Sequence, residues 1–474
     1  MPSVTRTAAE FAAGLSYDAL PPEVARRAKL LVFDTLGIAL RARRDAESTE
    51  SLVAAVRRLG MTGGAATAIG DPERYTAAGA ALINGALAHS LDFDDTHARG
   101  SIHASAPIVP AALAAAEESG ASGARTVAAV VAGYEVQIRL SLALGPSDHY
   151  ERGFHPTATC GAFGAAAAVG NVLGLDAAQI ESAFGICLSQ AAGSMQFLAD
   201  GAWTKRSHVG HAAMCGLMAA TLAAEGYRGP AQAFEGRAGF LASHAPDPDP
   251  AKAVAGLGET WETMQIAVKP YPSCRYGHAA MDAIIRLRKQ HDLRPDDVQE
   301  IEVGLPETGW KIVADPLADK QNPQNIVDGQ FSMPFVAAAA LINGGLAWDD
   351  YGPLLGDETA MALCRKVRPV VDARAQAEYP ANLAGAVKVT TAAGAFEDFV
   401  AVPKGEPGNF LTEDELRTKF DGLAAPYLEP ADRAAFADGL LALETAGDVS
   451  AVLRLSAGRP AGEPAIRAVA GQAA

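Results

Sequence analysis

Apolar residues along the chain follow a helical pattern at both ends and a mixed pattern in between. Across residues 22–41, apolar side chains recur every three or four positions, which is typical of one buried helix face. Pro22 suits the first turn of that helix. Similar patterns predict further helices at residues 7–19, 46–59, 76–91, 107–119, 124–145, 157–173, 177–192 and 207–226. Residues 1–266 are therefore expected to be helical.

The pattern changes near residue 267. Residues 299–305 alternate between apolar and polar side chains, which indicates a strand. Residues 387–402 alternate on both sides of a turn and predict a β-hairpin. Helices are expected between these strands, at 278–291 and 328–344. This part of the chain should form a smaller α+β domain.

The helical pattern returns from Thr412, which with Glu415 matches a capping box at the start of a helix. The simplest interpretation is a mainly α protein. A large all-α helical domain would be made from residues 1–266 plus 404–474, and a smaller α+β lid domain from 267–403 would be inserted into it.

Composition narrows the classes of function. The chain has 474 residues, enough for two or three domains at roughly 150 residues each. Its formal net charge of −16 argues against a nucleic-acid partner, and an anionic substrate would need local cations. The five cysteines are an odd number without C-x-x-C spacing, which argues against a disulfide framework and fits a cytoplasmic protein. No signal peptide or membrane-spanning run is expected, since the apolar run at 163–169 is too short.

The densest polar cluster is LDFDDTHARGSIH, residues 91–103, which connects two apolar helices. Functional residues concentrate on such loops, and Asp92, Thr96 and His103 are its candidates. The aspartates could instead only cap helices. A metal site is a further alternative, although the spacing matches no standard metal-binding loop.

A second cluster surrounds His155, which precedes Pro156 and a helix rich in small residues. The start of a helix favours an anion, so His155 is well placed for a negatively charged substrate. A lone histidine is otherwise more often a packing residue. Tyr150 is a nearby acid or base candidate with the same alternative.

Two more clusters supply cations and histidines. Lys205, His208 and His211 share roughly one face of a helix, and no glutamate stands between the two histidines as it does in zinc proteases. Lys269, Arg275 and His278 stand where the inserted domain begins. Positive charge at a helix start is unfavourable unless an anion is bound, which makes this group a candidate for substrate binding.

The sequence lacks the common motifs that bind organic cofactors or a catalytic zinc ion. The chain contains no P-loop, glycine-rich dinucleotide fingerprint, G-x-S-x-G or H-E-x-x-H motif. We therefore expect neither an organic cofactor nor a bound metal.

The four clusters, in this order and spacing, resemble the MmgE/PrpD family. The resemblance begins with RRAKLLVFDTLGIAL at residues 26–40 and covers nearly the whole chain. The family includes 2-methylcitrate dehydratase, cis-aconitate decarboxylase and iminodisuccinate epimerase. The resemblance implies a large helical domain with an inserted α+β lid, a homodimer, and a small di- or tricarboxylate as substrate.

The resemblance also implies a set of active-site residues. Carried over by motif, they are Asp92, Thr96, His103, His155, Lys205 and Lys269. Two departures from cis-aconitate decarboxylase argue against decarboxylation. The loop between Thr96 and His103 is one residue longer, and Phe335 replaces a tyrosine.

Together these residues predict a cofactor-independent lyase that transfers a proton next to a carboxylate. Lys205 and Lys269 would stabilise the developing charge, with Arg275 and His278 as further binding residues. His103 is our first choice of proton carrier and His155 our second, with Asp92 orienting one of them. An epimerase is the alternative, in which Tyr150 would share the proton transfer. A non-catalytic helical interaction protein would explain the helices equally well.

Overall fold

The computed structural model describes residues 3–199 and 201–458. The chain divides into two compact units, one made of Met1–Ala267 with Glu413–Ala474 and the other of Val268–Thr412. The first unit is mainly helical, and the second combines helices with a four-stranded sheet. That the second unit acts as a lid stays a prediction.

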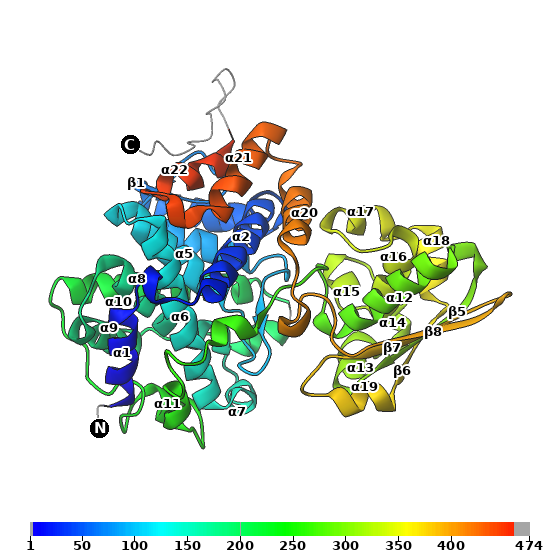
Figure 1. Ribbon diagram of the computed structural model, residues 1–474, viewed down its shortest axis with the longest axis horizontal. Helices are drawn as coiled ribbons and strands as arrows, with labels where there is room; N and C mark the ends of the chain where they lie inside the picture. Colours follow the sequence, from blue (N-terminus) through cyan, green and yellow to red (C-terminus); the bar gives the residue numbers. More distant parts are fainter. Residues whose placement is uncertain (1–2, 200, 459–474) are drawn as a thin grey trace. The chain divides into compact units, whose positions relative to one another are not determined.

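The centre of the first unit is a group of closely packed helices (Figure 1). Small residues allow this close approach: a Cβ atom on Gly164 would lie 2.8 Å from the carbonyl oxygen of Gly133 on the neighbouring helix. The central helices are α4 (Ala77–Ala88), α5 (Ser105–Ser119), α6 (Gly123–Leu144), α8 (Pro156–Leu173) and α10 (Thr204–Ala224).

Helices from both ends of the chain pack together in this unit, as the blue and orange-red segments of Figure 1 show. The rings of Phe33 and Phe420 stack at 4.6 Å, joining α2 (Pro22–Asp45) to α20 (Glu413–Ala424). The remaining helices of the unit are α1 (Val4–Gly14), α3 (Thr49–Arg58), α7 (Pro146–Glu151), α9 (Ala177–Cys187), α11 (Phe240–His244), α21 (Pro430–Leu441) and α22 (Ser450–Leu453).

The first unit is not entirely helical, which corrects the all-α expectation. It contains two short antiparallel pairs: β1 (Thr62–Thr67) with β2 (Arg74–Tyr75), and β3 (Thr96–His97) with β4 (Ile266–Ala267). The sequence of β1, TGGAAT, lacks the β-branched alternation that marks a strand. The β3–β4 pair joins segments far apart in sequence, which local patterns do not reveal.

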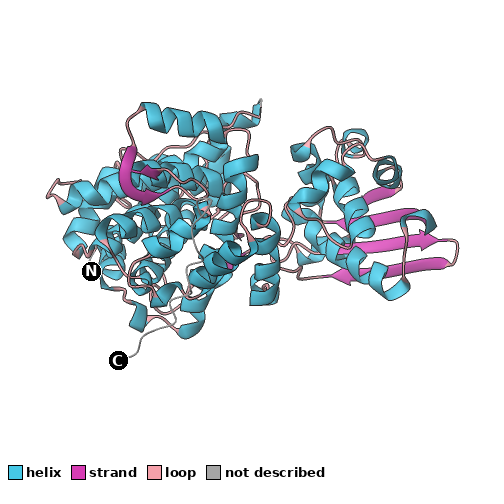
Figure 2. Ribbon diagram, turned by 90° about the horizontal axis from the view of Figure 1, so that it is seen from above, coloured by secondary structure: helices cyan, strands magenta, loops and turns pink. Residues whose placement is uncertain are grey.

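The second unit contains the sheet drawn in magenta in Figure 2. Its strand order is β6 (Val367–Val371), β5 (Val298–Leu305), β7 (Gly385–Thr391) and β8 (Gly394–Val400). The β5–β6 pair is parallel and the other two pairs are antiparallel. Helices α12 (His278–His291) and α16 (Met333–Asn343) pack against the sheet.

The expected strand and hairpin are confirmed as β5, β7 and β8, whereas β6 was missed. The single helix expected at 328–344 is wrong, because Ser332 separates α15 (Ile326–Gln330) from α16 and accepts a hydrogen bond from the Phe335 backbone. The other helices of this unit are short: α13 (Glu307–Val313), α14 (Leu317–Lys320), α17 (Tyr351–Leu354), α18 (Glu358–Cys364) and α19 (Ala373–Glu378).

Among the described residues, α6 alone is long and apolar enough to cross a membrane by length and composition. Its most apolar window is 94% buried inside the protein. This burial is what a core helix requires, so α6 is weak evidence for a membrane span.

Candidate active site

Four histidines of the first unit lie next to one another, and we call them the histidine cluster: His89, His103, His155 and His208. The ring of His89 is 4.7 Å from that of His103 and 5.7 Å from that of His155. The rings of His155 and His208 are 5.8 Å apart. His89 follows α4, His103 precedes α5, His155 precedes α8, and His208 lies on α10. Three helix ends and one helix thus converge on the cluster.

Asp94 is the carboxylate inside this cluster, and its side chain is fully buried. Its Oδ2 atom accepts a hydrogen bond from Nδ1 of His89 at 2.7 Å and lies 3.2 Å from Nδ1 of His103. Burial alone would raise the pKa of Asp94, but the two histidines outweigh it and hold the pKa well below its usual range. Asp94 is therefore a carboxylate anion at neutral pH.

Burial lowers the pKa of two histidines of the cluster strongly. It lowers the pKa of His89 to about 4, although Asp94 opposes the shift. It also lowers the pKa of His155 well below the ordinary value, with His89 and Lys205 adding to the effect. Both rings are thus neutral at neutral pH. The side chain of His103 differs in its burial, since 17% of it is exposed.

Several buried polar atoms of the cluster have no hydrogen-bond partner within the described part of the chain. They are Nε2 of His89, Nδ1 of His103, Nδ1 of His155, Nδ1 of His208, Oδ1 of Asp94 and, two residues further along the chain, Oγ1 of Thr96. Buried polar atoms are normally paired, and those that are not require an explanation. A bound polar ligand would supply these partners.

A cation lies beside the cluster. Nζ of Lys205, on α10, is 3.2 Å from Oδ1 of Asp92. Burial lowers the pKa of Lys205, but Asp92 and Asp94 more than compensate, so the net shift is upward and the lysine stays charged. Its side chain is 31% exposed. Asp92 adopts a left-handed backbone with φ of 52°, a conformation that non-glycine residues seldom take outside constrained sites.

The loop that carries Asp92 and Asp94 is fixed from two sides. Asp95 accepts hydrogen bonds from the backbone N–H and hydroxyl of Ser105, at 3.1 and 2.6 Å, which secures the start of α5. Burial raises the pKa of Asp95 to about 7. On α20, Nζ of Lys419 lies 2.7 Å from Asp34 and donates to the carbonyl of Phe93 at 3.3 Å. A helix from the C-terminal part of the chain therefore supports the loop.

Two histidines of the cluster and Asp94 have ligand atoms suitable for a metal ion. His89, Asp94 and His103 each offer one ligand atom, and these atoms lie within 4.8 Å of one another. Histidine nitrogen and carboxylate oxygen suit several divalent transition metals. The 2.7 Å contact between His89 and Asp94 is equally explained by a hydrogen bond.

The structure brings together several residues that the sequence analysis selected. His103 and His155 lie in the histidine cluster, and Lys205 pairs with Asp92 beside it. His89 and Asp94 were not selected, although both lie against His103. The available signal was weak: a histidine at the end of an apolar helix is followed five residues later by an aspartate in the same polar loop, and only the structure shows that the two side chains meet.

The other selected residues have different surroundings. Tyr150 donates a hydrogen bond to the carbonyl of Ser101 at 3.1 Å, and burial raises its pKa to about 12, which makes it a poor base at neutral pH. Lys269, Arg275 and His278 belong to the second unit. That they share a pocket with His103 stays a prediction.

Lys269, Arg275 and His278 each have their own surroundings within the second unit. Lys269 is 3% exposed. Nε of Arg275 lies 3.2 Å from Oε1 of Glu406, and Nε2 of His278 lies 3.2 Å from the carbonyl of Ser273. Arg275 is thus already neutralised by a carboxylate, and a substrate anion would compete with Glu406 for it.

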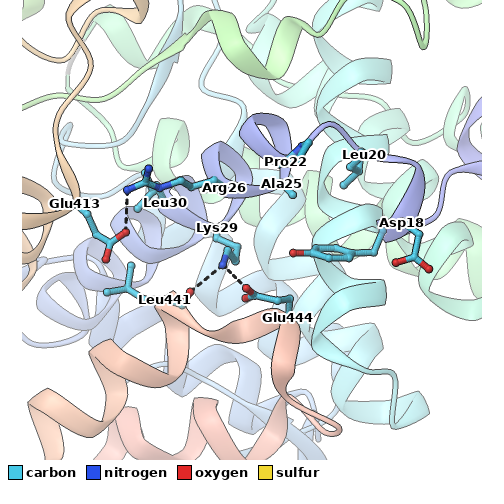
Figure 3. Close-up of a pocket in the computed structure, with 11 residues that line it drawn as sticks. Asp18, Leu20, Pro22, Ala25, Arg26, Lys29, Leu30, Glu413, Leu441 and Glu444 are labelled. Carbon is cyan, nitrogen blue, oxygen red and sulfur yellow. Dashed lines mark hydrogen bonds and ion pairs between the residues drawn. The ribbon is translucent and has the colours of Figure 1, made fainter.

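A separate pocket of about 400 Å³ lies where α2 begins (Figure 3). Its charged groups pair with each other: Nζ of Lys29 lies 2.5 Å from Glu444, and Arg26 lies 3.3 Å from Glu413. Histidine is absent from the residues that line it. Acid–base chemistry is therefore better served by the histidine cluster than by this pocket.

Comparison with known families matches both parts of the chain. Residues 6–253 match the MmgE/PrpD N-terminal domain, and residues 271–445 match the MmgE/PrpD C-terminal domain. The matched residues include the histidine cluster and Lys205 in the N-terminal domain, and Arg275 and His278 in the C-terminal one.

Curated relatives match over almost their full length. A cis-aconitate decarboxylase-like protein of Aspergillus oryzae is 30% identical, covering 96% of this chain and 98% of the relative. A cis-aconitate decarboxylase of Aspergillus terreus is 28% identical, covering 95% of both chains. A cis-aconitate decarboxylase of Homo sapiens is also 28% identical, covering 90% of this chain and 89% of its own.

Proposed function

This chain belongs to the MmgE/PrpD family, and on that premise we propose that it is a lyase acting on a small di- or tricarboxylate. The first candidate substrate is cis-aconitate, because the similar proteins above are named as cis-aconitate decarboxylases or as similar to one. The observation that carries the proposal is the histidine cluster, with its buried carboxylate Asp94 and the neighbouring cation Lys205.

Decarboxylation of such a substrate needs a site for developing charge and a proton donor. When the bond to the leaving carboxylate breaks, its electron pair moves through the double bond onto a remaining carboxylate, forming a dienolate. A preorganised cation stabilises this charge, and Lys205 is the candidate in the first unit. His103 then delivers a proton to carbon and regains one from solvent, to which it is partly exposed.

The same residues would allow the protein to bind an anionic substrate. The protein carries a net charge of −16, which repels an anion at long range. Binding must therefore come from local groups such as Lys205 and from N–H donors of the cluster. We propose that Lys269 contributes a second cation from the other unit and that closure of this unit excludes water.

The experiment is turnover of cis-aconitate in D₂O, followed by NMR. We expect loss of carbon dioxide and a five-carbon unsaturated dicarboxylate that carries one deuterium at the protonated carbon. Citrate, 2-methylcitrate and iminodisuccinate serve as comparison substrates in the same assay. If none of the four is converted by folded protein, the proposed function is wrong.

Dehydration is the second candidate, and Phe335 is the observation that favours it. The side chain is fully buried and its ring stacks on Tyr351 at 5.6 Å. It offers no hydroxyl at the position where the resemblance implies a tyrosine in cis-aconitate decarboxylase. In a dehydratase, the same histidine would protonate the leaving hydroxyl group. Conversion of 2-methylcitrate without release of carbon dioxide would select this candidate over decarboxylation.

A further inference from the structure

We infer that Asp94 and His89 form a positioning pair that fixes the orientation and proton-bearing nitrogen of His103. The inference rests on the proposed function, because it assigns His103 as the proton donor. Neither residue was selected from the sequence, and their role follows from the contacts around one carboxylate oxygen, Oδ2 of Asp94.

The first step concerns His89. Its side chain is fully buried and neutral at pH 7, so it carries a single N–H. Asp94 is an anion and can only accept hydrogen bonds, so the proton between the two residues belongs to Nδ1 of His89. This leaves Nε2 of His89 without a proton and without a partner among the described residues. His89 is thus held in one tautomer.

The second step concerns His103. Its Nδ1 lies 3.2 Å from the same oxygen of Asp94, an ion-pair contact that is not aligned as a hydrogen bond, and it has no hydrogen-bond partner among the described residues. The two nitrogens of an imidazole point in different directions, so contact between Nδ1 and Asp94 leaves Nε2 to exchange a proton with substrate. After Nε2 has protonated carbon, the neutral ring retains its Nδ1 proton facing Asp94. The carboxylate therefore stabilises the charged ring before transfer and keeps the correct tautomer afterwards.

The third step is that the loop cannot easily offer a substitute for Asp94. The adjacent carboxylate, Asp95, is committed to the backbone N–H and hydroxyl of Ser105. The backbone N–H of His103 donates to Oγ1 of Thr157 at 3.2 Å, which fixes the main chain but not the ring. Orientation of the ring thus depends on Asp94, and placement of Asp94 depends on the hydrogen bond from His89.

The test uses the full-length protein with the substrate that it converts. Asp94→Asn keeps the volume but removes the charge, and it should lower kcat by roughly 10²-fold or more while KM stays within about threefold. His89→Leu should lower kcat in the same way. His89→Asn should recover most of this loss, because the amide N–H of asparagine can replace Nδ1–H of histidine. Asp95→Asn is the matched control, expected to lower stability more than kcat.

A second readout does not depend on turnover. In protein with ¹⁵N-labelled histidine, NMR should show His89 as the Nδ1–H tautomer, and Asp94→Asn should change the signals of His89 and His103 but not those of His149. This measurement remains informative if no substrate is found, when the proposed function fails but the positioning pair can still be judged.

Several results would overturn the inference. It fails if folded Asp94→Asn retains wild-type kcat, if it raises only KM as loss of charge beside Lys205 would, or if His89→Leu and His89→Asn behave alike. Stoichiometric metal bound by the purified protein and lost in both Asp94→Asn and His89→Leu would assign these residues to a metal site instead. A large fall in kcat for His103→Asn, without one for Asp94→Asn, would leave the proposed function standing and reject the pair.

Discussion

Two kinds of buried histidine occur in the first unit, and they differ in how their ring nitrogens are paired. His97 is 1% exposed, and its nitrogens contact Glu262 at 2.9 Å and the backbone N–H of Gly100 at 3.0 Å. His149 is fully buried, and its nitrogens contact Thr159 at 2.8 Å and the carbonyl of His244 at 3.2 Å. Both nitrogens of each ring are thus paired inside the protein.

The histidine cluster contrasts with these residues. His89 and His155 are as deeply buried, yet each has a ring nitrogen without a partner in the described parts of the chain. An unpaired buried donor or acceptor typically costs about 1–3 kcal/mol. The comparison teaches that burial alone does not separate structural from functional histidines. What separates the two kinds of histidine in this structure is unsatisfied hydrogen-bonding capacity, and we propose that it marks the functional ones.

The largest expected effect comes from replacing one histidine of each kind by asparagine and comparing the two variants. His103→Asn should lower kcat by about 10²–10⁴-fold with little change in stability, because it removes the proton carrier. His97→Asn should instead lower the free energy of unfolding by about 1–3 kcal/mol, because Glu262 loses its buried partner. Steady-state kinetics and urea denaturation of both variants measure this contrast. Equal losses of kcat in the two variants would break it.

The next effect concerns the cation. Lys205→Ala should raise KM and lower kcat/KM by about 10–100-fold, because a substrate carboxylate loses its charge partner. Lys252→Ala is the control. The side chain of Lys252 is 59% exposed and forms a surface ion pair with Asp249 at 3.7 Å, which contributes little to stability. An unchanged kcat/KM for Lys205→Ala would remove this lysine from the site.

A smaller effect is the pH dependence of stability at His149. Burial lowers its folded-state pKa to about 4, below the value near 6.5 expected when unfolded. Between these values the unfolded chain binds a proton that the folded chain does not, so this residue costs stability as pH falls from 6.5. His149→Asn should therefore be destabilising at pH 7, and the difference from wild type should shrink by about 2 kcal/mol at pH 5.

Urea denaturation of wild type and His149→Asn at the two pH values gives this difference directly. Other buried groups, such as Asp95 with its raised pKa, act in the opposite sense but cancel in the comparison. A difference that grows on acidification would mean that His149 is protonated in the folded protein.

The smallest expected effect is that of a chelator. We expect EDTA to leave kcat unchanged, since hydrogen bonding explains the contacts of His89 and Asp94 without a metal. Metal analysis before and after dialysis provides the control. If EDTA abolishes activity and one divalent metal restores it, His89, Asp94 and His103 form a metal site.

The sequence predicts those elements of the fold that depend on neighbouring residues, and it misses those that depend on a partner distant in sequence. Helical periodicity locates α2 and α8, and alternation locates β5 and the β7–β8 hairpin. It does not locate β6, whose parallel partner β5 lies more than 60 residues earlier. Periodicity also missed the break at Ser332, where a side-chain cap starts a new helix inside one apolar run.

The candidate site follows the same rule. His103 and Lys205 could be chosen from the sequence because their residue types suit the chemistry and the resemblance supports them. Their neighbours could not be chosen in the same way, since pairing of Lys205 with Asp92 spans 113 residues of sequence. Asp94 and Asp95 are adjacent and chemically identical. Only the structure shows that one faces His103 and the other Ser105.

The most direct test of the central claim is a crystal structure of His103→Asn with cis-aconitate, in which slow turnover should preserve the substrate. The account predicts a carboxylate of the ligand within hydrogen-bonding distance of Lys205 and a second polar contact to an unpaired nitrogen of His155 or His208. A ligand bound instead in the pocket of Figure 3, with the histidine cluster left unoccupied, would contradict the account.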